Sequence, residues 1–169
     1  MTVTAVHTDL DTLTLTLHAD FDAPVEQVWQ LWADPRQLER WWGPPEYPAT
    51  ITTHDLQPGG RVAYHMTGPE GDQFHGYWDV VEVDAPRALV VHDGFAHPDG
   101  TPDDDHPRGR MRLTITDTDD GRTRMTIEGT YPDLASLEQV LAMGMEEGIT
   151  AAVGQVDAIL AEGAVSTAN

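Results

Sequence analysis

The sequence lacks cysteine and lysine, and basic residues of any kind are few. Without cysteine no disulfide framework can form, which fits a reducing compartment. All nine basic residues are arginine, against 29 acidic residues, so the formal net charge is −20. Such a surface repels the phosphates of nucleic acids and of anionic membranes, and neither is expected as a partner. The charge indicates either an acidic solubilising surface or a cationic partner, and the first interpretation predicts that stability rises with salt.

Long apolar runs and a targeting segment are also missing. No run approaches the ~18 residues that cross a bilayer, and residues 1–7 lack the basic stretch and apolar core of a signal peptide. We therefore expect a cytoplasmic protein without membrane insertion. A length of 169 residues is typical of one domain, so we expect a single domain over 1–169, with its core at about 12–162.

Motifs for common hydrolytic and phosphoryl-transfer chemistries are absent as well. There is no G-x-S-x-G, H-E-x-x-H or G-x-x-x-x-G-K-[ST] motif, so a hydrolase or kinase is not expected. His75 and His92 could meet across strands and, with Tyr64, perform acid–base chemistry. The segment 97–106 could capture a divalent cation, although it lacks the regular spacing of a calcium loop. We expect no catalytic residue, no cofactor and no metal site.

The first part of the chain predicts one strand followed by two short helices. Residues 12–17 alternate leucine and threonine, which is typical of a half-buried strand. Asp22 can cap a helix over 25–32, whose apolar residues recur at spacings of three and four. A second short helix is expected over 35–42.

Most of the remaining chain predicts strands separated by glycine and proline turns. Short links between them favour an antiparallel meander, and the longer link 96–108 is expected to be an exposed, mobile loop. In the third of these strands Val80, Val81 and Val83 cannot all face one way without a bulge. The expected strands span 47–56, 60–67, 73–84, 87–95, 109–117 and 122–131.

The last element is expected to be one long helix over 134–162, capped by Asp133 or Ser136. At ~1.5 Å per residue it would reach roughly 40 Å, enough to cross a domain and cover the apolar face of the sheet. Its apolar stripe consists of Leu134, Leu137, Leu141, Met145, Ala152, Val156, Ile159 and Leu160.

Four groups of residues carry a resemblance to a known family. They are Phe21–Pro24 with Val28-Trp29; Asp34-Pro35 with Trp41–Pro44; Pro58–Arg61 with Gly76, Glu82-Val83 and Pro86-Arg87; and Met145–Gly148 with Gln155–Asp157 and Leu160. In order and spacing they resemble the START-related helix-grip (SRPBCC) superfamily, in the branch named for homologues of the activator of the ninety-kilodalton heat-shock chaperone's ATPase. The resemblance covers about 12–162. It implies an α+β fold in which a curved, seven-stranded antiparallel sheet surrounds a long C-terminal helix and a cavity, with two short helices after strand one.

The resemblance also implies three alternative functions. Members of the superfamily bind lipids, sterols and polyketides, which implies a small apolar or amphipathic ligand. The co-chaperone that gives the branch its name carries a separate chaperone-binding domain; this sequence shows none and is very acidic, so a stress-related chaperone partner is not favoured. Other members catalyse cyclisation or dehydration, which would require at least two titratable residues converging in the cavity. A homodimer formed through exposed sheet edges is a further possibility.

The ligand-binding candidates begin with Trp41 and Trp42, which on a helix point about 100° apart. One is expected to pack in the core and the other to line the pocket mouth. Gly144 and Gly148 lie four apart in the predicted helix, which suggests the close approach of a ligand or of a strand or ring. Apolar residues of the strands and the helix complete the predicted lining, although each could equally be ordinary core. These are Tyr64, Met66, Phe74, Trp78, Met111, Leu113, Met125, Leu141 and Met145.

Overall fold

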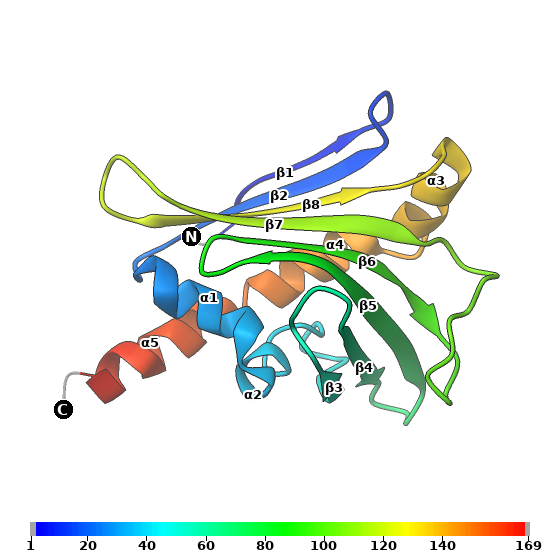
Figure 1. Ribbon diagram of the computed structural model, residues 1–169, viewed down its shortest axis with the longest axis horizontal. Coiled ribbons are helices and arrows are strands. Elements are labelled where there is room, and N and C mark those ends of the chain that lie inside the picture. The colour runs from blue at the N-terminus through cyan, green and yellow to red at the C-terminus, as the bar shows by residue number, and fades with distance from the viewer. Residues whose placement is uncertain (1–2, 168–169) are drawn as a thin grey trace.

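The structure is a computed structural model that describes residues 3–167. Within this range the chain forms an eight-stranded antiparallel sheet in the order β1-β2-β8-β7-β6-β5-β4-β3, with helices along its concave side (Figure 1). The strands are β1 Val3–Asp9, β2 Thr14–Phe21, β3 Ala49–His54, β4 Arg61–Thr67, β5 Gln73–Asp84, β6 Ala88–Ala96, β7 Gly109–Asp117 and β8 Thr123–Thr130. The helices are α1 Val25–Ala33, α2 Pro35–Leu38, α3 Leu134–Ala142, α4 Met145–Val153 and α5 Val156–Thr167.

The predicted meander is confirmed, because β3 to β8 lie side by side in chain order and agree with the predicted strands to within two residues at each end. The bulge expected in β5 is also present: its register with β6 shifts between Val80 and Glu82. Val81 therefore turns outward while Val80 stays buried. The fold class, α+β with a curved antiparallel sheet and C-terminal helices, agrees with a helix-grip arrangement.

The prediction of seven strands is wrong, because β1 adds an edge strand beside β2. Its register with β2 shifts between Val3 and Ala5, and this irregularity removes the strict alternation by which a strand is recognised in sequence. The strand expected at residue 12 begins at Thr14, since the preceding residues form the turn between β1 and β2. Leu13 lies in this turn at φ +59° and packs with a small cluster around Tyr131.

The helix predicted over 25–32 is confirmed as α1, but its predicted cap is wrong. Pro24 occupies the capping position, while Asp22 accepts a hydrogen bond from Arg122 Nε at 2.9 Å. The second helix is shorter than predicted: α2 ends at Leu38, and turns carry the chain onward. Asp34 caps α2 by accepting a hydrogen bond from the backbone N–H of Arg36 at 2.9 Å.

The long C-terminal helix is broken into α3, α4 and α5, which follow one another along the concave side of the sheet (Figure 1). Asp133 caps α3 as predicted, accepting a hydrogen bond from the Ser136 N–H at 2.7 Å. Gly144 then adopts a left-handed conformation, φ +85°, which is the usual conformation of a glycine that follows a helix end. Gln155 fixes the second break, because its Nε2 donates to the Gly43 carbonyl at 2.7 Å.

The predicted stripe of this helix is only partly buried, because the breaks turn the segments relative to one another. Leu134 is exposed, and Leu141 and Met145 are partly buried. The stripe residues that reach the core are Leu137, Ala152, Val156, Ile159 and Leu160.

The main core lies where α1 and α5 cover the sheet, and tryptophan dominates it. Trp32 contacts Trp41 edge to face, with ring centroids 4.9 Å apart, and Trp78 lies 5.8 Å from Trp32. Trp41 Nε1 donates to the Leu31 carbonyl at 3.0 Å, and Trp32 Nε1 donates to Met125 Sδ at 3.3 Å. Large aromatic side chains thus fill this end of the molecule.

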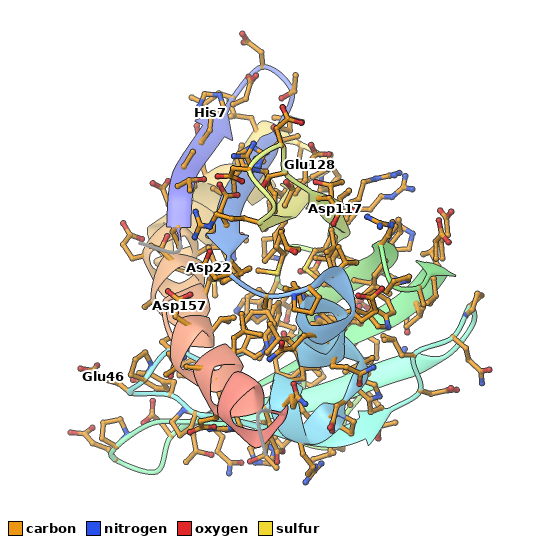
Figure 2. The ribbon with its side chains drawn as sticks, turned by 90° about the vertical axis from the view of Figure 1, so that its left-hand side faces the viewer. His7, Asp22, Glu46, Asp117, Glu128 and Asp157 are labelled. Atoms are coloured by element: carbon orange, nitrogen blue, oxygen red, sulfur yellow. The ribbon has the colours of Figure 1, made fainter. Side chains whose placement is uncertain are left out.

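Acidic side chains are spread over the surface rather than gathered in one patch. Figure 2 shows Asp117 on β7, Glu128 on β8 and Asp157 on α5, with Asp22 and Glu46 in connecting segments. Several arginines pair with acidic partners, but nine of them cannot neutralise 29 carboxylates. Among the residues that the structure describes, no helix combines the length and hydrophobicity needed to span a bilayer.

Candidate functional site

A cavity of about 440 Å³ lies between the concave face of the sheet and the segment from α3 to α4. This volume is within the ~300–1,000 Å³ typical of small-molecule sites. Its walls are mainly apolar. The sheet contributes residues that include Leu15, Leu17, Tyr64, Met66, Phe74, Met111 and Ile127, the helical side contributes Val140, Met143, Gly144, Met145, Gly148 and Ile149, and the segment before β3 contributes Trp42, Pro44 and Tyr47.

Many of the predicted ligand-binding residues line this cavity. On the strands, the alternation of side chains directs them to the concave face, as expected from the sequence. Contact with a ligand remains a prediction for all of them. The predicted residues found in the lining are Trp42, Tyr64, Met66, Phe74, Met111, Gly144, Met145 and Gly148.

Five predicted residues lie elsewhere. Leu113 and Met125 also face the concave side, but α1 covers their end of β7 and β8, so both are fully buried core. Trp41 and Trp78 are likewise fully buried, and Leu141 packs against the Tyr131 cluster. The alternation of side chains along a strand identifies which residues face inward. It does not tell which of these inward residues a helix covers.

The tryptophan pair divides as the sequence predicts. Trp41 is fully buried in the core, whereas Trp42 belongs to the same core cluster and also lines the cavity. Their rings meet edge to face, at 85° with centroids 5.6 Å apart.

The two glycines line the cavity without any close approach of a strand or ring, so that alternative is wrong. A Cβ at Gly148 would meet nothing nearer than Pro44 Cγ at 3.9 Å, and one at Gly144 nothing nearer than Glu147 Oε2 at 3.9 Å. Gly144 ends a helix. Gly148 lies inside α4, where the missing side chain leaves volume to the cavity.

A polar group within this apolar lining was missed by sequence reasoning. Asp93 on β6 is paired in register with Trp78 and Gly109, so it shares their concave face. The hydroxyl-bearing residues Tyr64 and Tyr131 complete the group. The signal was present: Val91 and Phe95 mark the inward positions of β6, and Asp93 stands between them at the same parity.

Gly109 makes room for this polar group. A Cβ at Gly109 would lie 3.1 Å from Asp93 Oδ1 and 3.0 Å from Tyr131 Cε1, tighter than ordinary contacts. The absence of a side chain on β7 therefore lets Tyr131 and Asp93 approach one another.

Burial shifts the protonation of all three members of the group. Desolvation raises the pKa of Asp93 to about 6, although a hydrogen bond from its own backbone N–H and, to a lesser extent, the charge of Arg108 oppose this rise. Desolvation also raises the pKa of Tyr64 and of Tyr131, and the negative charge of Asp93 adds to both shifts. At neutral pH the cavity therefore holds two neutral phenols beside one carboxylate.

Two indole donors border the same region. Trp42 Nε1 and Trp78 Nε1 are buried without a hydrogen-bond acceptor among the described residues. Both indoles lie near enough to the Tyr64 hydroxyl to lower its pKa, though by less than burial raises it. Unpaired buried donors are uncommon, and they make this end of the cavity favourable for an acceptor.

The structure does not bring His75 and His92 together, and it forms no metal site among the described residues. His75 does not meet His92: its ring lies 5.5 Å from that of His65, and β5 pairs His92 with Asp79. His75 does reach the cavity lining. Over the described residues no group of three histidine or acidic side chains could hold a metal ion, and His106 instead contacts Asp103 at 2.8 Å.

Comparisons with known proteins agree with this architecture. The family model described as activator of Hsp90 ATPase homolog 1-like protein matches residues 22–161. A crystal structure of a Mycobacterium smegmatis protein is 52% identical with TM-score 0.87, covering 94% of this chain and 96% of that one. A solution structure of an Arthrobacter aurescens protein is 43% identical with TM-score 0.90, covering 95% and 93%.

A crystal structure of the AHSA1 protein from Silicibacter pomeroyi is 20% identical with TM-score 0.70, covering 88% of this chain and 97% of that one, and shows the shared fold alone. The comparison with curated proteins gives no match.

Proposed function

The chain belongs to the family of activator of Hsp90 ATPase homolog 1-like proteins, and on that premise we propose that it binds a small hydrophobic or amphipathic molecule in its cavity. The observation that carries the proposal is the cavity of about 440 Å³, whose walls are mainly carbon. Burying apolar ligand surface there would contribute roughly 25 cal/mol per Å². Gly148 also supports the proposal. The helix has room for an alanine at this position, but its side chain would narrow the cavity, so the glycine keeps the cavity open.

A chaperone-associated, stress-related role is less well supported. It would require an exposed apolar surface for the partner. Phe74 and Met143 are exposed, at 52% and 48%, but both also line the cavity, so they are explained as its rim. The other exposed large apolar side chains, Leu10, Val81 and Leu134, lie in the turn after β1, on β5 and on α3. The acidic surface gives no complementary feature either.

An enzyme is the second candidate function, because one specific observation favours it. The cyclase or dehydratase alternative required titratable residues converging in the cavity, and Tyr64, Asp93 and Tyr131 do converge there. A carboxyl group with a pKa of about 6 suits general acid–base work near neutral pH. Binding remains the first proposal, since it needs the cavity alone.

The binding proposal is tested by filling the cavity. Native mass spectrometry of freshly purified protein should reveal a co-purified small molecule, and a thermal-shift screen of lipids and aromatic compounds should find stabilising ligands. Gly148→Leu should abolish both signals, because its side chain extends into the cavity. Ala151→Leu is the matched control: it adds a leucine to an exposed position of the same helix and should leave both signals intact.

The outcomes also separate the two candidates. No co-purified molecule together with no thermal shift would refute binding. A molecule of the same mass on the wild type and on Asp93→Asn supports a binding protein. A different mass on the variant, as expected if substrate accumulates unconverted, supports the enzyme.

The cellular setting and assembly are proposals of the same standing. The absence of cysteine supports the cytoplasm. The positions of β1 and β3 at the two edges of the sheet support a homodimer, because an edge strand can pair with a second copy. Light scattering coupled to size exclusion would test the second point.

A further inference from the structure

Asp93 is a partly buried carboxyl group that lines the cavity and has no side-chain partner among the described residues. Its oxygens receive no hydrogen bond and no ion pair from another side chain of the described residues. The nearest cation, Arg108, is engaged elsewhere: its Nη2 lies 3.1 Å from Asp79 Oδ2. A carboxylate partly withdrawn from water in this way is stabilised by a donor that reaches it from the cavity.

None of the described side chains that face Asp93 donates a hydrogen bond to it, so a donor would have to come from a ligand. Tyr64 from β4 and Tyr131 beyond β8 are neutral phenols, and neither donates to the carboxylate. The cavity's helical side offers Met143, Met145 and Ile149, which do not titrate. His75 is the remaining titratable side chain on the strands that line the cavity.

We propose that Asp93 selects the ligand by its polar end, accepting a hydrogen bond from an alcohol, phenol or ammonium group on a molecule whose apolar body lies between Met111 and α4. The inference rests on the proposed function and specifies its ligand class: an amphipathic molecule with an uncharged or cationic donor and no carboxylate at that end. Gly109 is part of the recognition, because a side chain there would occupy the space beside Asp93 Oδ1.

The test uses four probes with one naphthalene body, measured by calorimetry at pH 8. They are 2-naphthylmethylamine, 2-naphthylmethanol, 2-naphthoate and 2-methylnaphthalene. The amine, which is protonated at this pH, and the alcohol should each bind about tenfold or more tightly than the carboxylate, which Asp93 repels. Comparing the first two separates a cationic from a neutral donor.

Asp93→Asn should remove the preference. The ammonium probe should lose about tenfold or more in affinity, and 2-methylnaphthalene should change by less than about twofold, since it makes no polar contact. Asp84→Asn is the matched control: it removes the same charge from an exposed position of β5 outside the cavity and should leave all four affinities unchanged.

The pH dependence gives an independent check. Because the free carboxyl group of Asp93 titrates near 6, the affinity of the ammonium probe should fall about tenfold from pH 7.5 to pH 5 in the wild type and stay level in Asp93→Asn. The inference would be refuted if 2-methylnaphthalene binds but the order of the four affinities is the same in Asp93→Asn as in the wild type. It would also be refuted if 2-naphthoate is the preferred probe. Either result would leave the proposed function standing. Failure of all four probes to bind would overturn the inference, whereas the proposed function is refuted by the mass-spectrometry and thermal-shift outcome given above.

Discussion

The two ends of the concave face share the same strands but are covered in different ways. At one end α1 and α5 press large side chains onto the sheet, and Trp32, Trp41 and Trp78 are completely buried. At the other end the cover is α4, which presents Gly148 to the sheet, and about 440 Å³ stays open. Aromatic residues occur at both ends, so composition does not distinguish them. The size of the covering side chains does.

The ends also differ in how polar atoms are satisfied. In the filled end, Trp41 Nε1 and Trp32 Nε1 both have acceptors. Where the filled end borders the cavity, the indoles of Trp42 and Trp78 have none among the described residues, and Asp93 receives no hydrogen bond from another side chain there. A void and an unpaired polar group each reduce stability. Their occurrence together supports the proposal that this end binds a ligand.

The largest expected effect comes from truncating one aromatic residue at each end. Trp41→Ala should lower the free energy of unfolding by about 3–5 kcal/mol, because it leaves a large void and frees the Leu31 carbonyl. Phe74→Ala, at the half-exposed rim, should cost under about 1 kcal/mol. Guanidinium unfolding measures both values. Similar losses for the two variants would show that the ends are not packed differently.

Asp93→Asn should give the next largest change in the free energy of unfolding, and this change should be an increase. The carboxyl group ionises at 3.8 in its unperturbed state but only near 6 when folded, so wild-type stability should fall as pH rises from about 4 to 6 and remain reduced above. The variant lacks this loss. At pH 8 it should therefore be more stable than the wild type by up to about 3 kcal/mol, with no difference below about pH 4. Unfolding titrations across this range supply the measurement, and a constant difference at all pH values would contradict it.

Gly148→Ala should stabilise the hollow end slightly. The helix gains about 1 kcal/mol from alanine, and the new Cβ has room, since its nearest neighbour is 3.9 Å away. Thermal unfolding in the absence of ligand would show the gain. A loss of stability would mean that α4 packs more closely on the sheet than the structure shows.

Salt should produce the smallest change in stability, because it acts on the charged surface as a whole rather than on either end of the concave face. With a net charge of −20, screening of self-repulsion should raise the free energy of unfolding by under about 1 kcal/mol between low and high sodium chloride. The pH-dependent loss caused by Asp93 should persist in high salt, because desolvation rather than repulsion by other charges is the main cause of its raised pKa. Disappearance of that loss in salt would show that charge repulsion causes the shift.

Much of the sheet could be predicted because its turns are marked by glycine and proline and its strands alternate. Strands β5 and β7 were predicted with their observed bounds, and the bulge at Val81 followed from three valines of conflicting parity. The first strand was missed because its register is irregular. The helix breaks were missed because a continuous apolar pattern hides a left-handed residue such as Gly144.

The site could be predicted less completely than the sheet. Alternation identified inward residues such as Met66 and Met111, but the choice between core and cavity depends on which helix lies above, as Leu113 shows. Asp93 was missed because the lining was predicted from apolar residues, and Asp93 is a polar residue at an inward position. Its proximity to Tyr131 arises from the pairing of β6, β7 and β8, which no local pattern contains.

The breaks at Gly144 and Gly154 have a consequence for how the cover of the cavity is held in place. They leave α4 as a separate helix of nine residues, too short to be stable alone, since isolated helices below about 12–15 residues are marginal in water. Its helicity therefore depends on what lies beneath it. A bound molecule would supply part of that support, so the folding of α4 and the occupancy of the cavity become a single coupled equilibrium.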